Sequence, residues 1–261
     1  MSGGQIQVER QDGVATLTVC HPERRNAMTL AMWQQLAAAL RELEGTGVRV
    51  LVLTGAGSRA FVSGADISEF DQARDGEAAV VRYNQAVAQA QQMLAEFSAP
   101  TVALIQGACM GGGIGLALAC DLRYASASAR FRMPAARLGL GYSLADMRRL
   151  VDVVGAASAF DLFYTARILD SEQAERRGLV HERYADDDFA RQTQARVRGI
   201  AANAPLSLRA AKAAILATMN PPAPARTEAI DALVRQCFDS ADYAEGRRAF
   251  AEKRDPVFLG R

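Results

Sequence analysis

The sequence predicts an α/β fold in which strands and helices alternate ahead of a C-terminal helical region. Between residues 48 and 121, a strand pattern, an irregular loop and a helix pattern follow one another twice. From about Ala156 onward the pattern is almost wholly helical. Such alternation favours a parallel or mixed sheet with helices packed outside it, and it places functional loops at the carboxyl ends of the strands.

The first elements have clear local signals. Residues 6–11 and 14–20 alternate β-branched and polar side chains around Asp12 and Gly13, which predicts a hairpin. In residues 29–44 the large apolar side chains recur at helical spacing until Gly45, which predicts a helix that ends there. These apolar residues are Met32, Leu36, Leu40 and Leu43. The apolar run 48–55 is expected to be a buried strand.

The later elements are assigned by the same patterns. Residues 55–70 read as an irregular loop, and a helix is expected from about Glu77 to Phe97. Residues 101–107 then form a strand that leads into a glycine-rich segment. A break in the C-terminal helices is expected between Asn220 and Pro224, which enclose two further prolines.

Composition excludes several classes of protein. Thirty basic and 29 acidic residues give a formal charge of +1, which argues against general binding of nucleic acid or anionic membranes. No segment has the roughly 18 uncharged apolar residues of a spanning helix, and the N-terminus lacks the apolar core of a signal peptide. The four cysteines form no C-x-x-C pair, and three lie in apolar runs, as reduced core cysteines do. We therefore expect a cytoplasmic protein.

The glycine-rich segment, residues 107–121 (GACMGGGIGLALACD), admits several interpretations. A dinucleotide fingerprint lacks its third glycine here, and Asp121 comes too early to hold a ribose. A Walker loop would need Gly-Lys-Ser/Thr, which is absent from the sequence. The glycines could simply let a helix pack closely on the sheet. Alternatively, glycines that open a helix expose backbone N–H groups that can bind an anion or oxyanion.

A second segment could complete such an oxyanion site. In residues 60–70 (AFVSGADISEF), Gly64 follows a bulky apolar pair and supplies a flexible turn. The next residues, Ala65, Asp66 and Ile67, would present more backbone donors at the exit of a strand. We expect the two loops to converge.

Residues 60–67, 107–134 and 135–155 resemble the crotonase (enoyl-CoA hydratase/isomerase) superfamily in order and spacing. The resemblance extends through residues 165–180 and 239–258 and so covers nearly the whole chain. It implies a spiral of ββα units as the core, residues 1–200, that binds acyl-CoA. It also implies a C-terminal helical region, residues 201–261, that assembles trimers, often paired as hexamers.

The resemblance also implies roles for single residues. The thioester carbonyl would lie between the backbone N–H groups of Ala65 and Gly112, beside Gly111. In the turn HPERRNA, the residues Arg24, Arg25 and Ala27 would contact coenzyme A, although a solvated charged turn is the alternative for the two arginines. The segment 65–67 would line the adenine side.

In the C-terminal tail, Phe250 and Lys253 would reach the ligand of a neighbouring subunit, although an amphipathic surface helix is the alternative. Coenzyme A would enter as part of the substrate, with no further cofactor and no metal. Apolar residues at helical spacing near the C-terminus, namely Ile230, Leu233, Val234 and Cys237, suggest a face buried between subunits.

The sequence departs from the family where hydratases carry two glutamates, because those positions hold Gly115 and Ala135. Each acid or base contributes typically about 10²–10⁴-fold to such reactions, so other groups must carry any chemistry. The candidates are Tyr142, which matches a tyrosine of methylmalonyl-CoA decarboxylase-like members, together with Ser143 and Asp146. Ala65 replaces the histidine that those decarboxylases carry.

The same loop leaves alternatives open. Residues 141–145 nearly match the G-x-S-x-G motif of serine hydrolases, but only His21 and His181 could serve as the base. Ser143 could instead cap a helix, paired with Asp146 three residues later. Two function classes follow: an acyl-CoA lyase, isomerase or decarboxylase, or a protein that binds acyl-CoA without turnover.

Overall fold

Two β-sheets form the centre of the computed structural model, which describes residues 3–66, 77–219 and 224–261. The six-stranded sheet has the order β1-β2-β3-β5-β7-β10, and the four-stranded sheet has the order β4-β6-β8-β9. The first comprises β1 (Gln5–Gln11), β2 (Val14–Cys20), β3 (Val50–Gly55), β5 (Thr101–Ile105), β7 (Leu122–Ser126) and β10 (Glu182–Tyr184). The second comprises β4 (Ala60–Val62), β6 (Ala108–Met110), β8 (Arg130–Arg132) and β9 (Leu169–Asp170).

The core is a spiral of ββα units, as predicted. The first unit is β3, β4 and α3 (Glu77–Ala95), and the second is β5, β6 and α4 (Gly112–Ala119). The third is β7 and β8 followed by α5 (Leu144–Thr165). The first strands of the units pair in parallel in one sheet, and the second strands pair in parallel in the other. Each unit therefore repeats the path of the one before it, one strand spacing further along both sheets.

The predicted hairpin is confirmed. Strands β1 and β2 pair antiparallel and end on the pair Gln11 and Val14. The two turn residues, Asp12 and Gly13, have φ of 51° and 78°, which is the left-handed conformation that a two-residue hairpin turn requires. Strand β2 then pairs in parallel with β3, so the sheet is mixed.

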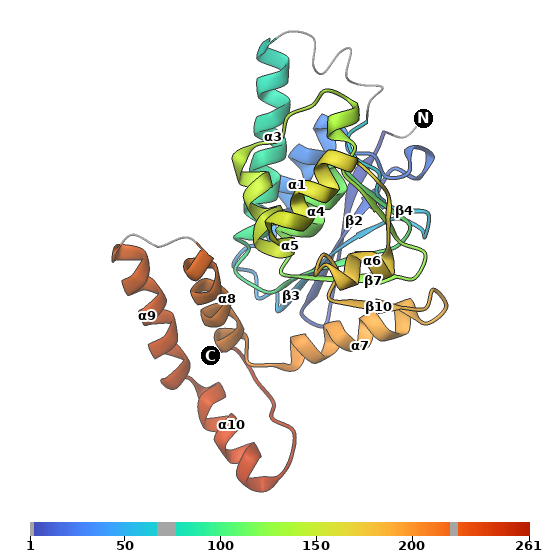
Figure 1. Cartoon of the computed structure of the whole chain (residues 1–261). Helices are drawn as coiled ribbons and strands as arrows, with labels where there is room; N and C mark the ends of the chain where they lie inside the picture. The colour runs from blue at the N-terminus through green and yellow to red at the C-terminus, as the bar shows by residue number, and fades with distance from the viewer. Residues whose placement is uncertain (1–2, 67–76, 220–223) are drawn as a thin grey trace.

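The helices cover the six-stranded sheet unequally. Helix α1 (Leu30–Leu43) begins at Thr29, whose hydroxyl accepts from the Met32 N–H, and it buries the predicted apolar face. Figure 1 shows α1, α3, α4 and α5 gathered on one side of the sheet and α7 (Phe189–Ala202) below it. Alternate residues of β3 serve the two sides, because Leu51 and Leu53 join the large core while Val50 and Val52 pack toward α7.

Short strands correct two expectations. The loop read as irregular contains β4, and the region read as almost wholly helical contains β9 and β10. Strand β4 pairs with β6, β9 with β8, and β10 with β7. Strands of two or three residues are formed by these neighbours, because so few residues carry no periodic signal of their own.

Three helices, α8 (Pro205–Met219), α9 (Pro224–Phe238) and α10 (Ala241–Glu252), extend away from the sheets as an arm (Figure 1). The expected break at residues 220–223 lies outside the described residues, and Pro224 begins α9. Of the predicted interface face, Ile230, Leu233 and Cys237 are half-buried within the chain itself and Val234 is exposed. The division at residue 200 stays a prediction.

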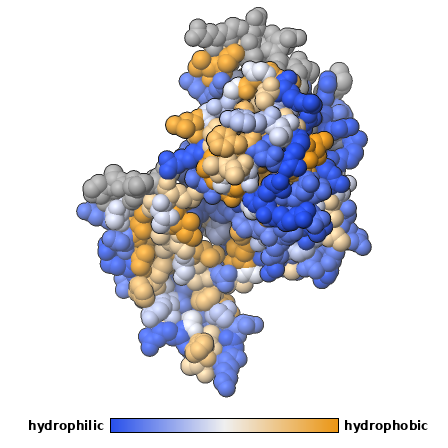
Figure 2. Space-filling model, in the orientation of Figure 1, coloured by the Kyte–Doolittle hydropathy of each residue, from blue (hydrophilic) through white to orange (hydrophobic). Residues whose placement is uncertain are grey.

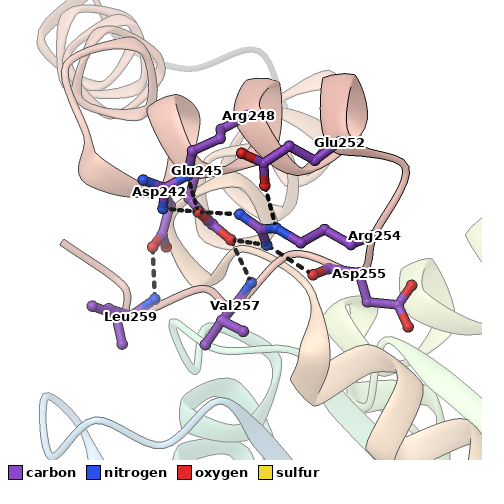
Figure 3. A network of polar contacts seen from close by, with 8 residues as sticks. All are labelled: Asp242, Glu245, Arg248, Glu252, Arg254, Asp255, Val257 and Leu259. Carbon is purple, nitrogen blue, oxygen red and sulfur yellow. Dashed lines mark hydrogen bonds and ion pairs between the residues drawn. The ribbon is translucent and has the colours of Figure 1, made fainter.

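Polar contacts tie the end of the chain to α10 (Figure 3). Glu245 accepts from Arg254 at 2.6 Å, from the Val257 N–H at 3.1 Å and from Arg248. Asp242 accepts from the N–H groups of Leu259 and Gly260 at 2.6 and 2.8 Å. These carboxylates hold the tail antiparallel to the helix that precedes it.

Large apolar side chains are exposed on this arm. Figure 2 shows apolar surface along the C-terminal helices, and the most exposed residue there is Phe250, at 87%. The others are Ile215, Met219, Val234, Phe238, Tyr243, Val257 and Leu259. Throughout the three described ranges, no helix is long and apolar enough to cross a membrane. All four cysteines are free.

Candidate active site

A cavity of about 560 Å³ lies where the two predicted loops meet. Its wall includes Ala65 from the first loop and Gly111 and Gly112 from the second. Tyr142, Ser143 and Asp146 border the same space from the start of α5. Six residues selected from the sequence therefore line one cavity, although they come from three distant segments.

Backbone pairing orients the Ala65 loop. Met28 and Ala65 form an isolated parallel bridge, in which the Met28 N–H donates to Gly64 O and the Asp66 N–H donates to Met28 O. Because successive N–H groups of an extended chain point to opposite sides, the Ala65 N–H points away from Met28. No acceptor for it is found in the described part of the chain. The Ala65 N–H is thus available on the side of the cavity.

The start of helix α4 supplies the second donor. Gly111 is the N-cap, with φ 50° and ψ −111°, a conformation that only glycine adopts readily. Its N–H donates to Arg132 O, and its carbonyl accepts from the N–H groups of Ile114 and Gly115. Gly112 is the first helical residue, whose N–H has no partner within the helix. The helix dipole adds partial positive charge at this point.

Two further glycines of the segment, Gly113 and Gly115, are required by space. A Cβ on residue 113 would overlap the carbonyl oxygen of Val62 in β4, so helix α4 packs directly on the second sheet. A Cβ on residue 115 would overlap the amide nitrogen of Gln91 on α3. The close-packing interpretation therefore explains Gly113, whereas the available N–H group lies at Gly112, because the Gly111 N–H donates to Arg132 O.

Residues that the sequence did not single out hold the two loops in register. The Trp33 Nε1 donates to Tyr83 Oη at 3.2 Å, and Tyr83 Oη lies 3.4 Å from Met28 O. The Trp33 ring lies under Gly112, where a Cβ would be 3.4 Å from Cζ2. Trp33 and Tyr83 are almost fully buried. Nothing in the sequence distinguishes them from ordinary aromatic residues of the core.

The capping interpretation of Ser143 is confirmed. Its hydroxyl oxygen accepts from the Asp146 N–H at 3.1 Å, and its hydroxyl lies 2.7 Å from Asp146 Oδ2. Ser143 is the N-cap of α5. The ring of Tyr142 packs edge-on against Phe163, with centroids 5.6 Å apart, and its hydroxyl reaches the edge of Gly111.

Asp146 begins a polar chain along the cavity wall. Arg149 Nη1 lies 3.6 Å from Asp146 Oδ1, and it donates to Gln91 Oε1 at 3.4 Å. Arg149 Nη2 donates to Gln92 Oε1 at 2.6 Å. Among the described residues that line the cavity, Asp146 is the one charged side chain. Gln91 also lines the cavity. Its only signal in the sequence is that it follows Val87 by four residues, which places both on one face of the predicted helix.

The geometry gives no support to a serine or cysteine nucleophile. Neither His21 nor His181 is part of the cavity wall. Burial and the Arg123 charge lower the pKa of His181, whose Nδ1 accepts from the Arg123 N–H at 3.2 Å. Burial raises the pKa of the Cys120 thiol to about 12 and raises that of Cys109 as well, so both remain protonated at neutral pH.

The remaining predicted residues lie outside this cavity. Arg24 and Arg25 are exposed, and their carbonyls accept from the Ser63 hydroxyl and N–H at 3.1 and 3.2 Å, so the turn lies beside the Ala65 loop. Ala27 and Asp66 are buried and are not part of the cavity wall. Ile67 lies outside the described residues.

Phe250 and Lys253 lie on and directly after α10, outside the wall of this chain's cavity. The described residues hold no cluster of three His, Cys, Asp or Glu that could bind a metal ion. Ala135, which stands at one of the two positions where hydratases of the family carry a glutamate, is buried and lines the cavity.

A second, larger cavity of about 730 Å³ lies on the other side of the six-stranded sheet. Residues of β1, β2 and α7 line it, and none of the candidate catalytic or coenzyme A-binding residues does. Its charged wall includes Glu9, Asp12, Arg49 and Arg191. The two loops that the sequence suggests as an oxyanion site, those of Ala65 and Gly112, both border the smaller cavity.

Known proteins similar to this chain are described as enoyl-CoA hydratases or as members of that family. Residues 9–261 match the family described as enoyl-CoA hydratase/isomerase. A probable enoyl-CoA hydratase of Rhodobacter capsulatus is 35% identical over 261 residues, which covers both chains completely. The crystal structure of an enoyl-CoA hydratase/carnithine racemase from Magnetospirillum magneticum superposes with a TM-score of 0.92 at 34% identity, covering 98% of this chain and 96% of that one.

Proposed function

Because the chain belongs to the enoyl-CoA hydratase/isomerase family of the crotonase superfamily, we propose that it binds an acyl-CoA thioester in the 560 Å³ cavity. The thioester carbonyl accepts hydrogen bonds from the N–H groups of Ala65 and Gly112. The observation that carries the proposal is that both groups face one cavity and that, among the residues described, neither has a protein acceptor.

Such a pair of donors favours reactions that pass through an enolate. As a proton leaves the α-carbon, or as a bond to that carbon breaks, negative charge develops on the carbonyl oxygen. Fixed donors stabilise that charge more than they stabilise the neutral carbonyl, and one donor of this kind is worth about 3 kcal/mol in comparable sites. The positive end of the α4 dipole acts in the same direction.

Asp146 is the group that we propose to move the proton. Among the described residues of the cavity wall, Asp146 carries the one charged side chain. The Ser143 hydroxyl orients its carboxylate on one side and Arg149 on the other. One carboxylate suffices to take a proton from the α-carbon and to return it. Tyr142 borders the same region and orients the acyl group.

Hydration of a double bond makes greater demands, because a base must activate water while an acid protonates the α-carbon. Gly115 and Ala135 supply neither group at the positions where the resemblance places them. We therefore assign a reaction in which one acid/base group acts on an enolate, such as isomerisation or decarboxylation, ahead of ordinary hydration.

The rest of the proposal concerns coenzyme A and assembly. Arg24 and Arg25 are exposed beside the Ala65 loop, where they can meet the phosphates of a bound coenzyme A. Phe250 is exposed on α10, the helix that Figure 1 shows at the outer end of the arm, and it is not part of the wall of its own cavity, which suits a contact with a second chain in a trimer. A cytoplasmic location is part of the same proposal.

Exchange of the α-hydrogen tests this function without knowledge of the true substrate. The protein is incubated in D₂O with butyryl-CoA, 3-butenoyl-CoA and acetoacetyl-CoA, and deuterium uptake beyond that of a protein-free blank is read by mass spectrometry. We expect uptake with at least one thioester and a loss of about 10²-fold or more in Asp146→Asn. Binding without exchange or product formation for any thioester would instead identify a non-catalytic acyl-CoA-binding protein.

A further inference from the structure

Gln91 is a mostly buried residue whose side-chain amide lies at the cavity wall. Only 3% of the residue is exposed, yet it lines the cavity from helix α3. Its oxygen is defined by chemistry, because Arg149 can only donate and Nη1 lies 3.4 Å from Oε1. The nitrogen consequently faces Gly115. Across the described ranges no acceptor is paired with Gln91 Nε2.

Gly115 shows that the position of this amide is built into the fold. The residue lies inside helix α4, where glycine is about 1 kcal/mol less favourable than alanine. Its conformation is helical, so backbone strain does not require glycine there. A Cβ would overlap Gln91 Nε2 and lie 3.3 Å from its Cδ. Gly115 therefore leaves the space that the amide occupies.

Nε2 is not one of the fully buried polar atoms that lack a partner, so the cavity leaves it open to an acceptor, which a ligand oxygen can supply. Gly115 lies three residues after Gly112, which is about 4.5 Å along a helix axis. That distance matches the separation between a thioester oxygen and an oxygen carried near C3 of the acyl chain. An amide NH₂ donates only, so it suits a keto or carboxylate oxygen better than a hydrocarbon chain.

Building on the proposed acyl-CoA site, we propose that Gln91 selects thioesters with a keto or carboxylate oxygen at C3. Arg149 acts as a positioning residue, since it holds the amide oxygen and so turns the nitrogen toward the substrate. Gly115 gives that nitrogen its room. The substrate class is thus a 3-oxoacyl or malonyl-type coenzyme A ester.

The test compares two ligands that differ at C3, butyryl-CoA and acetoacetyl-CoA, by isothermal titration calorimetry. We expect the full-length wild-type protein to bind acetoacetyl-CoA about tenfold more tightly, the ratio that one hydrogen bond supports. In Gln91→Met the ratio should fall to about one, with binding of butyryl-CoA retained. Gly115→Ala should lower the ratio by displacing the amide.

Gln92→Met is the matched control. Gln92 is the next residue on the same helix and bonds to the same arginine, but it is exposed and does not line the cavity. Its ratio should equal that of the wild type. Gln91→Asn, which withdraws the amide by one methylene, provides the same measurement if Gln91→Met does not fold.

The outcomes separate this inference from the proposed function. A wild-type ratio near one, or a ratio that stays high in the Gln91 variants, would overturn the role of Gln91 and leave the thioester site in place. Failure to bind either ligand would overturn both. A ratio that falls equally in the Gln92 control would show that the effect is general to helix α3, and it too would overturn the assignment.

Discussion

The carboxylate of Asp121 and the ammonium of Lys212 lie 2.9 Å apart and join the core to helix α8. Asp121 Oδ2 also accepts from the Thr101 N–H at 2.8 Å, and Lys212 Nζ donates to Ala99 O at 3.2 Å. The lysine side chain is 8% exposed and the aspartate 28%. Asp121, which could have been read as a ribose ligand, therefore holds the start of strand β7 and the arm together.

Removal of one partner of this pair should destabilise the protein. Asp121→Ala leaves a nearly buried ammonium without its counter-ion and the Thr101 N–H without its acceptor, which should lower the free energy of unfolding by about 2–3 kcal/mol. Asp121→Ala combined with Lys212→Met should recover part of the loss, because the unpaired charge is gone. Urea unfolding measures both. Equal stability of wild type and Asp121→Ala would contradict the prediction.

Binding of acyl-CoA should stabilise the folded protein. At a ligand concentration one hundred times Kd, the stabilisation is about 2.7 kcal/mol, which should raise the Tm by roughly 5 °C. Gly112→Val should abolish the shift, because its methyl groups occupy the approach to the two N–H donors.

Gly199→Val is the control for this substitution. Gly199 is an exposed helical glycine on α7, with open space where a side chain would stand. Gly199→Val likewise replaces a helical glycine by valine, and it should keep the ligand-induced rise in Tm. No shift in the wild type with any coenzyme A ester at millimolar concentration would refute the thioester site.

Hydration of crotonyl-CoA should be slow. Without a glutamate at 115 or 135, we expect a rate on the order of 10⁴-fold below that of an ordinary hydratase, since the two lost groups act as one unit. Tyr142→Phe, Ser143→Ala and Asp146→Asn should lower kcat for the true substrate with little change in binding where the residue acts in the transition state. Rapid hydration unaffected by all three would show that other groups activate water.

The C-terminal tail should respond to pH through Glu245. Hydrogen bonds from Arg254, Arg248 and the Val257 N–H hold the pKa of this carboxyl well below its usual range. A depressed pKa means that the stabilisation is complete above the ordinary glutamate pKa of about 4.3 and is lost as the pH falls through the lower, folded value.

Glu245→Gln should therefore speed hydrogen exchange at the Val257 amide at pH 7, and the difference from the wild type should vanish in strong acid. Glu252→Gln is the control, because Glu252 also accepts from Arg254 but half of its side chain is exposed and it holds no tail amide. Faster exchange in the control than in Glu245→Gln would contradict the assignment.

Assembly should follow from the exposed apolar side chains of the arm. Light scattering at micromolar concentration should give three or six times the 28.0 kDa mass of the chain. Phe250→Asp should weaken assembly without lowering the stability of the single chain, because 87% of the residue is exposed there. A monomeric wild-type protein would refute the trimer.

Local sequence determined much of this protein. The Asp12-Gly13 turn, the helix from Leu30 and the glycine-opened helix α4 follow from backbone preferences and apolar spacing that act within a few residues. The family motifs likewise located both loops of the cavity. Short-range signals sufficed because the turn residues, the apolar spacing and the glycines at the helix start each lie within a few consecutive residues.

Tertiary structure decided the rest. The outward direction of the Ala65 N–H depends on its bridge to Met28, and the place of the Gln91 amide depends on the absence of a side chain at Gly115. Strand β9 exists only because it pairs with β8. These relationships join residues that are distant in sequence, and the free energy that fixes them comes from packing and pairing of whole elements, which no local pattern records.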